Sequence, residues 1–182
     1  LEQAQQSATT DALKLEQQLP NSTYIAPDFK HLTLAEQKVA LTDAYTQLNA
    51  LQDELQQAEI NFSNTQTLPE RNQRRIADTL KLLEDAKAQL ATLDSSQQQT
   101  PDYIYWQLKT DVHNAELNVL RQELQINPTQ QRYANIKQQW VALQIEHAKR
   151  SISLREQHLT QQRDAQLDSL LAYGSAEDLQ LL

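Results

Sequence analysis

Residues 33–62, TLAEQKVALTDAYTQLNALQDELQQAEINF, decide the fold of this chain. A large apolar side chain recurs at every seventh position, and small or apolar side chains fill a second position of the same repeat. Apolar residues at two heptad positions over four heptads indicate the packing surface of a coiled coil. We therefore predict a core seam through Leu41, Leu48, Leu51 and Leu55, within the full set Leu34, Leu41, Ala44, Leu48, Leu51, Leu55, Ala58 and Phe62.

The two ends of this helix carry separate signals. Thr33 and Glu36 fit a capping box, in which the two side chains satisfy each other's backbone N–H groups. Thr67-Leu68-Pro69-Glu70 reads as the start of a new helix, since proline is tolerated in a first turn. The sequence thus predicts a helical hairpin over 33–94, followed by a polar turn over 95–100. The expected apolar stripe of its second arm is Ile76, Leu80, Leu83, Leu90 and Leu93.

The C-terminal half predicts a helix plus one very long helix over 101–174. Pro101 opens the first helix, and Pro128 marks a break or a kink before the second. Gly174, the only glycine, suits a left-handed C-terminal cap, so residues 175–182 read as the start of a further, truncated helix. We expect Trp140 and Leu143 in the core seam of the long helix. The stripe expected before Pro128 is Leu108, Val112, Ala115, Val119 and Ile126.

Residues 1–32 predict a helix followed by a loop. Ala4, Ala8, Ala12, Leu15 and Leu19 form one helical stripe, and the stretch from Pro20 to Leu32 reads as a loop that crosses a helix end.

The composition supports an all-α fold. The 182 residues contain one glycine and 29 glutamines, whereas barrels, sandwiches and Rossmann units need many glycines for turns with positive φ. We predict an elongated antiparallel bundle of coiled-coil hairpins with one very long C-terminal helix, all in one domain.

Charge and residue usage exclude several classes of function. The net charge of -8 disfavours duplex nucleic acid and anionic membrane surfaces as partners. No apolar run approaches the ~20 residues that span a bilayer. The absence of cysteine excludes disulfides and thiolate metal sites, and the absence of methionine leads us to expect a processed chain or a fragment.

The polar residues show no catalytic or cofactor-binding pattern. His147 and His158 share a helix face but lack metal-ligand spacing, and we expect no metal, no cofactor and no enzyme activity. One unusual cluster is Arg71, Arg74 and Arg75, because three arginines near a helix start oppose the helix dipole. Glu70 and Arg74 form a favourable i, i+4 pair. We expect the cluster either to pair with acidic residues of a neighbouring helix or to contact another subunit or an anionic envelope component.

Two stretches carry a family resemblance. Thr67-Leu68-Pro69-Glu70-Arg71 and Ala115-Glu116-Leu117-Asn118-Val119-Leu120-Arg121-Gln122-Glu123-Leu124 stand before a long glutamine-rich helix. This succession, over roughly residues 40–170, resembles the extracytoplasmic N-terminal domain, often labelled "porin", of large bacterial mechanosensitive channels of the potassium-dependent MscK (KefA) type. The resemblance implies a periplasmic helical region of a homo-oligomeric inner-membrane channel, a heptamer, whose membrane helices lie outside this chain.

We therefore expect a non-catalytic periplasmic domain of a mechanosensitive channel, with an architectural, subunit-contact or gating role. Its expected partners are the other subunits and, second, envelope components. Two alternatives remain open: the coiled-coil hairpin of a periplasmic adaptor in an efflux or secretion system, and a cytosolic coiled-coil scaffold. Lipoyl-like β modules beside the hairpin would favour the adaptor, and many transmembrane helices would favour the channel.

Overall fold

The computed structural model describes residues 2–29, 31–93 and 100–180, without the side chains of residues 2, 4, 5 and 172–180. Most of the described residues lie in three α-helices: α1 (Glu2–Gln18), α2 (Leu34–Ala91) and α3 (Pro101–Gln180). The described residues contain no strand, which confirms the all-α prediction. The expected turn over 95–99 and the boundary at residue 94 lie outside the described residues.

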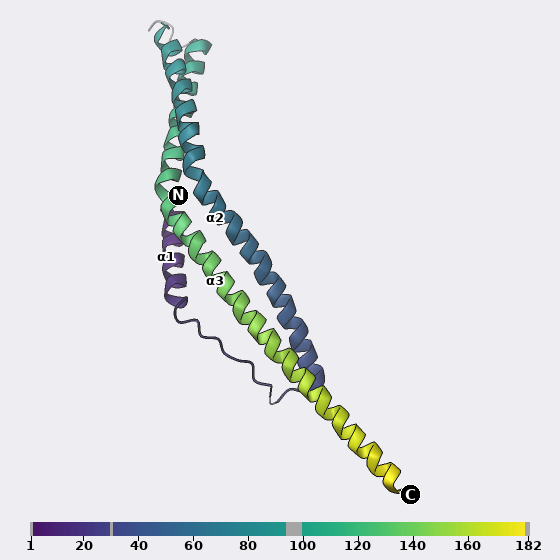
Figure 1. Cartoon of the computed structure of the whole chain (residues 1–182). Helices are drawn as coiled ribbons and strands as arrows, with labels where there is room; N and C mark the ends of the chain where they lie inside the picture. Colours follow the sequence, from purple (N-terminus) through teal and green to yellow (C-terminus); the bar gives the residue numbers. More distant parts are fainter. Residues whose placement is uncertain (1, 30, 94–99, 181–182) are drawn as a thin grey trace. The chain divides into compact units, whose positions relative to one another are not determined.

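The long helices α2 and α3 pack against each other in opposite directions (Figure 1). Cross-helix bonds join Thr65 to Asn127, Asn72 to Glu123 and Arg75 to Glu116. The partner's number falls along α3 as the number rises along α2, which defines an antiparallel pair.

The chain divides into two compact units that cut across the domain boundaries expected at 33–94 and 101–174. Unit 1 comprises Leu1–Glu16 and Ala58–Lys137, and unit 2 comprises Gln17–Gln57 and Gln138–Leu182. Each unit contains a segment of α2 and a segment of α3.

The heptad seam of α2 is longer than the sequence led us to expect. The less exposed positions continue every seventh residue from Leu34 to Leu90, with Pro69 at one of them. The second heptad position continues likewise, through Ala58 and Ala86, which are 4% and 1% exposed. The capping box at its start is confirmed, because the Thr33 N–H donates to Glu36 Oε2 at 2.7 Å and the Glu36 N–H donates to Thr33 Oγ1 at 3.3 Å.

The predicted break at Pro69 is wrong, since α2 runs through it as one helix. Proline has no N–H, so the carbonyl four residues earlier, that of Thr65, loses its helical donor. Asn127 replaces that donor from α3: its Nδ2 donates to the Thr65 carbonyl oxygen at 3.0 Å, and Asn127 is only 3% exposed. The hairpin expected within 33–94 does not form, and α2 pairs with α3 instead.

The C-terminal half is also one helix. Thr100 caps α3, where its Oγ1 accepts the Tyr103 N–H at 3.3 Å, and α3 continues through Pro128 and Gly174 to Gln180. The cap expected at Gly174 is therefore wrong, and residues 175–180 belong to α3 while 181–182 lie outside the described residues. A single glycine inside a helix costs only about 1 kcal/mol relative to alanine, which does not end a helix by itself.

The seam that α3 presents to α2 differs from the predicted one. Its half-buried and buried positions repeat with heptad spacing from Tyr103 to Gln162, and they include Leu117, Leu120 and Val141, which are 3%, 1% and 1% exposed. We call this set the inner seam: Tyr103, Trp106, Thr110, His113, Leu117, Leu120, Leu124, Asn127, Gln131, Ala134, Gln138, Val141, Ile145, Ala148, Ile152, Arg155, Leu159 and Gln162.

Candidate functional site

The arginine cluster on α2 divides into three different environments. Arg75 Nη2 donates to Glu116 Oε1 on α3 at 2.8 Å, so this arginine pairs with an acidic residue of the neighbouring helix. Arg74 pairs with Glu70 on its own helix, at the predicted i, i+4 spacing. Arg71 is exposed and makes no ion pair within the described part of the chain. Arg71 is thus the member of the cluster most available for an external contact. The contact itself, with another subunit or an anionic envelope component, stays a prediction.

The residues predicted for the core seam occupy two different surfaces. Leu41, Leu48, Leu51 and Leu55 are half-buried on the α2 seam. Trp140 and Leu143 are also half-buried, but they lie outside the inner seam of α3. They belong to a second apolar line along α3, on the side away from α2.

We call this second line the outer stripe. It follows the third and sixth heptad positions of α3, counted from Tyr103 as the first. Its members are Tyr105, Leu108, Val112, Ala115, Val119, Gln122, Ile126, Thr129, Tyr133, Ile136, Trp140, Leu143 and His147. Most of these side chains are apolar or aromatic, so α3 has two faces that favour burial.

Helix α1 covers the outer stripe in one part of unit 1. Arg132 Nε and Nη2 donate to Glu16 Oε1 and Oε2 at 2.8 and 2.6 Å, which forms a bidentate ion pair between α3 and α1. Ala12 of α1 is 1% exposed, and it lines a groove together with Thr129 and Arg132. On this part of the stripe Ile126 and Ile136 are each 6% exposed. The outer stripe is therefore a surface on which a helix packs.

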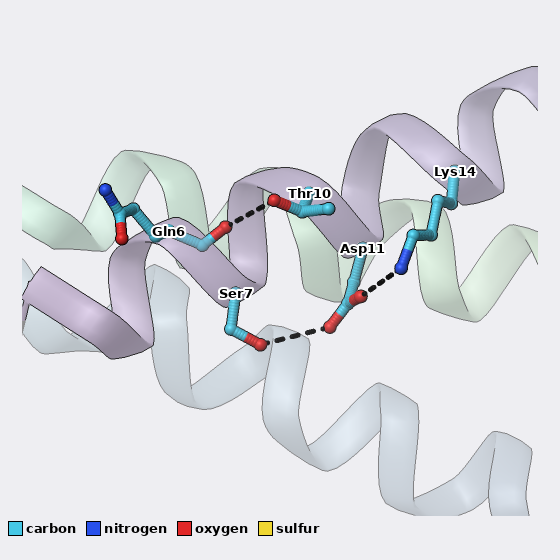
Figure 2. A network of polar contacts seen from close by, with 5 residues as sticks. All are labelled: Gln6, Ser7, Thr10, Asp11 and Lys14. Carbon is cyan, nitrogen blue, oxygen red and sulfur yellow. Dashed lines mark hydrogen bonds and ion pairs between the residues drawn. The ribbon is translucent and has the colours of Figure 1, made fainter.

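Polar side chains of α1 bond to one another beside its alanine face. Figure 2 shows Asp11 between Ser7, whose Oγ donates to Asp11 Oδ2 at 3.2 Å, and Lys14, whose Nζ lies 3.6 Å from Asp11 Oδ1. The Thr10 hydroxyl donates to the Gln6 carbonyl oxygen at 2.9 Å. These bonds stay within α1, which leaves its alanine face for α3.

A segment without helix or strand takes the place of a helix in unit 2. Residues 19–29, here called the strap, contribute Tyr24, whose ring centroid lies 5.6 Å from that of His147, and Phe29, stacked on His158 at 4.7 Å. Arg155 Cζ also lies 5.8 Å from the Phe29 ring centroid, within cation–π range. Both histidines contact aromatic rings along the side of α3. The loop was expected to cross a helix end, and that expectation is wrong.

The outer stripe is open over residues 104–119. Leu108 is 61% exposed, Val112 is 54% exposed and Val119 is 47% exposed. Ile104 and Tyr105 continue the open surface toward the start of α3, at 55% and 52%. These include the residues that the sequence predicted as the packing seam, and that prediction is wrong because α2 packs on the inner seam instead. We call the surface of Ile104, Tyr105, Leu108, Val112, Ala115 and Val119 the open face.

Charged and aromatic groups border the open face. Lys109 Nζ lies 5.3 Å from the Tyr105 centroid and 5.0 Å from the Trp106 centroid, within cation–π range. Glu116 stands one heptad later on the same edge and holds Arg75. Asp111 lies on the opposite edge and is exposed.

The titratable groups form no catalytic arrangement in the described ranges. Hydrogen bonds from the Thr33 backbone N–H and hydroxyl lower the pKa of Glu36, which is a cap. The hydrogen bond to Glu156, at 2.5 Å, raises the pKa of Tyr45, which links α2 to α3 in unit 2. Among the residues that the structure describes, no group of three or more His, Asp or Glu side chains is placed to hold a metal ion.

No described helix combines the length and apolar character needed to cross a membrane. Comparison with known proteins produced no relative: no family model, no curated protein and no solved structure matches this chain.

Proposed function

We propose that this chain is a non-catalytic helical domain of a bacterial mechanosensitive channel, located in the periplasm, with a mechanical or subunit-contact role. The observation that carries the proposal is the heptad seam, which continues along α2 from Leu34 to Leu90 and along α3 from Tyr103 to Gln162. Antiparallel paired helices resist bending and stretching better than loops do, because every turn of each helix is held by its partner.

The resemblance in sequence supports the finer part of the proposal. The Thr67–Arg71 stretch lies within α2, and Ala115–Leu124 lies within α3, on facing segments of unit 1. The cross-helix bonds Asn72–Glu123 and Arg75–Glu116 join these regions. The two most distinctive stretches of the resemblance are thus neighbours in the fold.

The proposed mechanism is a bias on channel gating. A domain outside the membrane changes the closed–open equilibrium only through contacts that differ between the two states. Exposed side chains such as Arg71 are candidates for these contacts, with neighbouring subunits or with anionic envelope components as partners. The domain holds no pore residue in this proposal, so it does not set conductance.

Patch recordings of the parent channel test this proposal. Deleting the domain is expected to leave single-channel conductance nearly unchanged and to alter the tension threshold, the adaptation or the effector response. Leu48→Asp with Leu51→Asp in the full channel should act in the same direction, because unpaired charges unfold the seam. Val39→Glu, at a position that is 62% exposed, is the matched control and should behave like the parent. Altered conductance with unchanged gating would refute the mechanical role.

The antiparallel α2–α3 pair of unit 1 gives a specific reason to retain the periplasmic adaptor as an alternative. Its α2 and α3 segments are antiparallel and carry exposed apolar residues near the connection, among them Leu82 and Tyr105, at 50% and 52%. An adaptor hairpin in an efflux or secretion system needs such a surface to dock. Loss of substrate export on Tyr105→Glu in the parent protein, with no tension-activated current in patches, would favour the adaptor over the channel.

A further inference from the structure

The outer stripe of α3 shows what kind of element fits its open face. In the neighbouring part of the stripe, α1 packs on α3 through Ala12 and the Arg132–Glu16 pair. The open face continues the same heptad positions without interruption from Ile126 back to Tyr105. A second helix is therefore the element that matches its spacing and its width.

We propose that the open face binds the open face of a second copy of this chain, as an antiparallel two-fold dimer. This proposal uses only contacts within unit 1 and does not depend on the channel proposal.

The apolar positions are self-complementary in this arrangement. In an antiparallel coiled coil, the two core heptad positions of one helix meet each other across the interface. A two-fold axis between His113 and Asn114 places Leu108 opposite Val119 of the second copy, and Val112 opposite Ala115 of the second copy. The symmetry repeats both layers, as an isologous interface requires. Four consecutive apolar layers result.

The charges at the edges select this direction. In the antiparallel arrangement Lys109 faces Glu116 of the second copy, which is an attractive pair formed twice, and Asp111 faces the neutral Asn118. In a parallel arrangement Asp111 would face Glu116 of the second copy, a repulsive pair formed twice. Glu116 binds Arg75 through Oε1, and a carboxylate accepts several donors, so it can hold both cations.

Equilibrium sedimentation of the 182-residue chain tests the dimer. The expected mass is twice 20.9 kDa at high concentration and 20.9 kDa on dilution. Val112→Glu should weaken dimerisation by at least about 100-fold, because it buries two unpaired charges per dimer. At 54% exposure this residue contributes little to the monomer, so the melting curve of the diluted variant should match that of the parent. Val39→Glu, an exposed valine in unit 2, should leave the mass unchanged.

Cysteine cross-linking tests whether the two copies of α3 are antiparallel or parallel in the dimer. Because the chain has no native cysteine, every cross-link comes from the introduced residues. An oxidised mixture of the single variants Leu108→Cys and Val119→Cys should give the mixed cross-linked dimer, and neither variant alone should cross-link. Cross-linking of each variant alone would show a parallel dimer and overturn the proposal. A chain that stays monomeric at every concentration, or a dimer that Val112→Glu does not weaken, would also overturn it. Protection of the open face only on addition of another protein would assign the face to that partner.

Discussion

We expect the hydrogen bond from Asn127 to the Thr65 carbonyl to stabilise the fold only because Pro69 removes the helical donor of that carbonyl. A double-mutant cycle measures this dependence. Asn127→Leu removes the only cross-helix donor to this carbonyl that the structure records among the described residues. Leaving a buried carbonyl unpaired costs about 1–3 kcal/mol. We therefore expect Asn127→Leu to lower the free energy of unfolding by about 2 kcal/mol in the parent chain.

The second arm of the cycle replaces the proline. Pro69→Ala restores the N–H that pairs with the Thr65 carbonyl inside α2, and it relieves a penalty of about 3 kcal/mol for proline inside a helix. In this background Asn127→Leu should be neutral or stabilising, since it also removes the Asn127 Oδ1, a buried atom without a partner among the described residues. The expected coupling energy is therefore about 2 kcal/mol.

Urea unfolding followed by far-UV circular dichroism gives all four values of the cycle. The four free energies are comparable when the slope of the unfolding free energy against urea is the same in the four variants. A matched control is Asn118→Leu, an exposed asparagine of α3, for which no coupling to Pro69 is expected. Equal costs of Asn127→Leu with and without Pro69 would refute the reasoning, because the asparagine would then stabilise the fold independently of the proline.

Three further outcomes are expected. Leu48→Asp with Leu51→Asp should reduce helicity or markedly lower the melting temperature, because two charges enter the α2 seam; an unchanged melt would exclude these leucines from the core. The lowered pKa of Glu36 means that its cap stabilises the fold above the ordinary glutamate pKa of 4.5 and loses this contribution as the pH falls through the lowered value. Glu36→Gln should therefore flatten the acid limb of stability against pH, and an identical limb would contradict the assignment. Adding zinc or calcium should leave the melting temperature unchanged, and a saturable rise would reveal a metal site.

The sequence predicted the elements whose evidence is local. The heptads from Leu34 to Phe62, the capping box at Thr33 and the start of α3 at Pro101 each depend on residues within a few turns. These features hold because side chains at i, i+3, i+4 and i+7 share a face wherever the chain is helical.

The continuity of α2 could not be predicted in the same way. Pro69 is a valid helix start when it is read with its neighbours, and the donor that compensates for it lies far along the chain, at Asn127. One feature of the sequence does indicate a continuous helix. The heptad register that starts at Leu34 continues unbroken across Pro69 to Ile76 and Leu83. A true restart has no reason to preserve that register.

The choice between the two faces of α3 failed for a different reason. Over residues 104–119 every position of the outer stripe is apolar or aromatic, whereas the inner seam carries the polar Thr110 and His113 beside Trp106 and Leu117. Hydrophobicity alone therefore points to the wrong face. Only the register extended from Val141, Ile145 and Ile152 identifies the inner seam, because the heptad positions of one helix keep a constant spacing.

The buried polar residues of the α2 seam and the inner seam explain how a narrow core specifies one register of α2 against α3. Asn72, Thr79 and Asn127 are 5%, 3% and 3% exposed, and they occupy positions where apolar residues would give more burial. Two of them form directed bonds: Asn72 Nδ2 donates to Glu123 at 2.7 Å, and Asn127 Nδ2 donates to the Thr65 carbonyl at 3.0 Å. A slip of α2 along α3 by one heptad would keep apolar side chains in contact but would break both bonds. Buried amides at core positions fix register in coiled coils for this reason. Between Leu108 and Val119, the open face of α3 has no amide at the heptad positions of its apolar layers. In the proposed dimer, the charges at the edges of the open face would therefore set the register of one copy against the other.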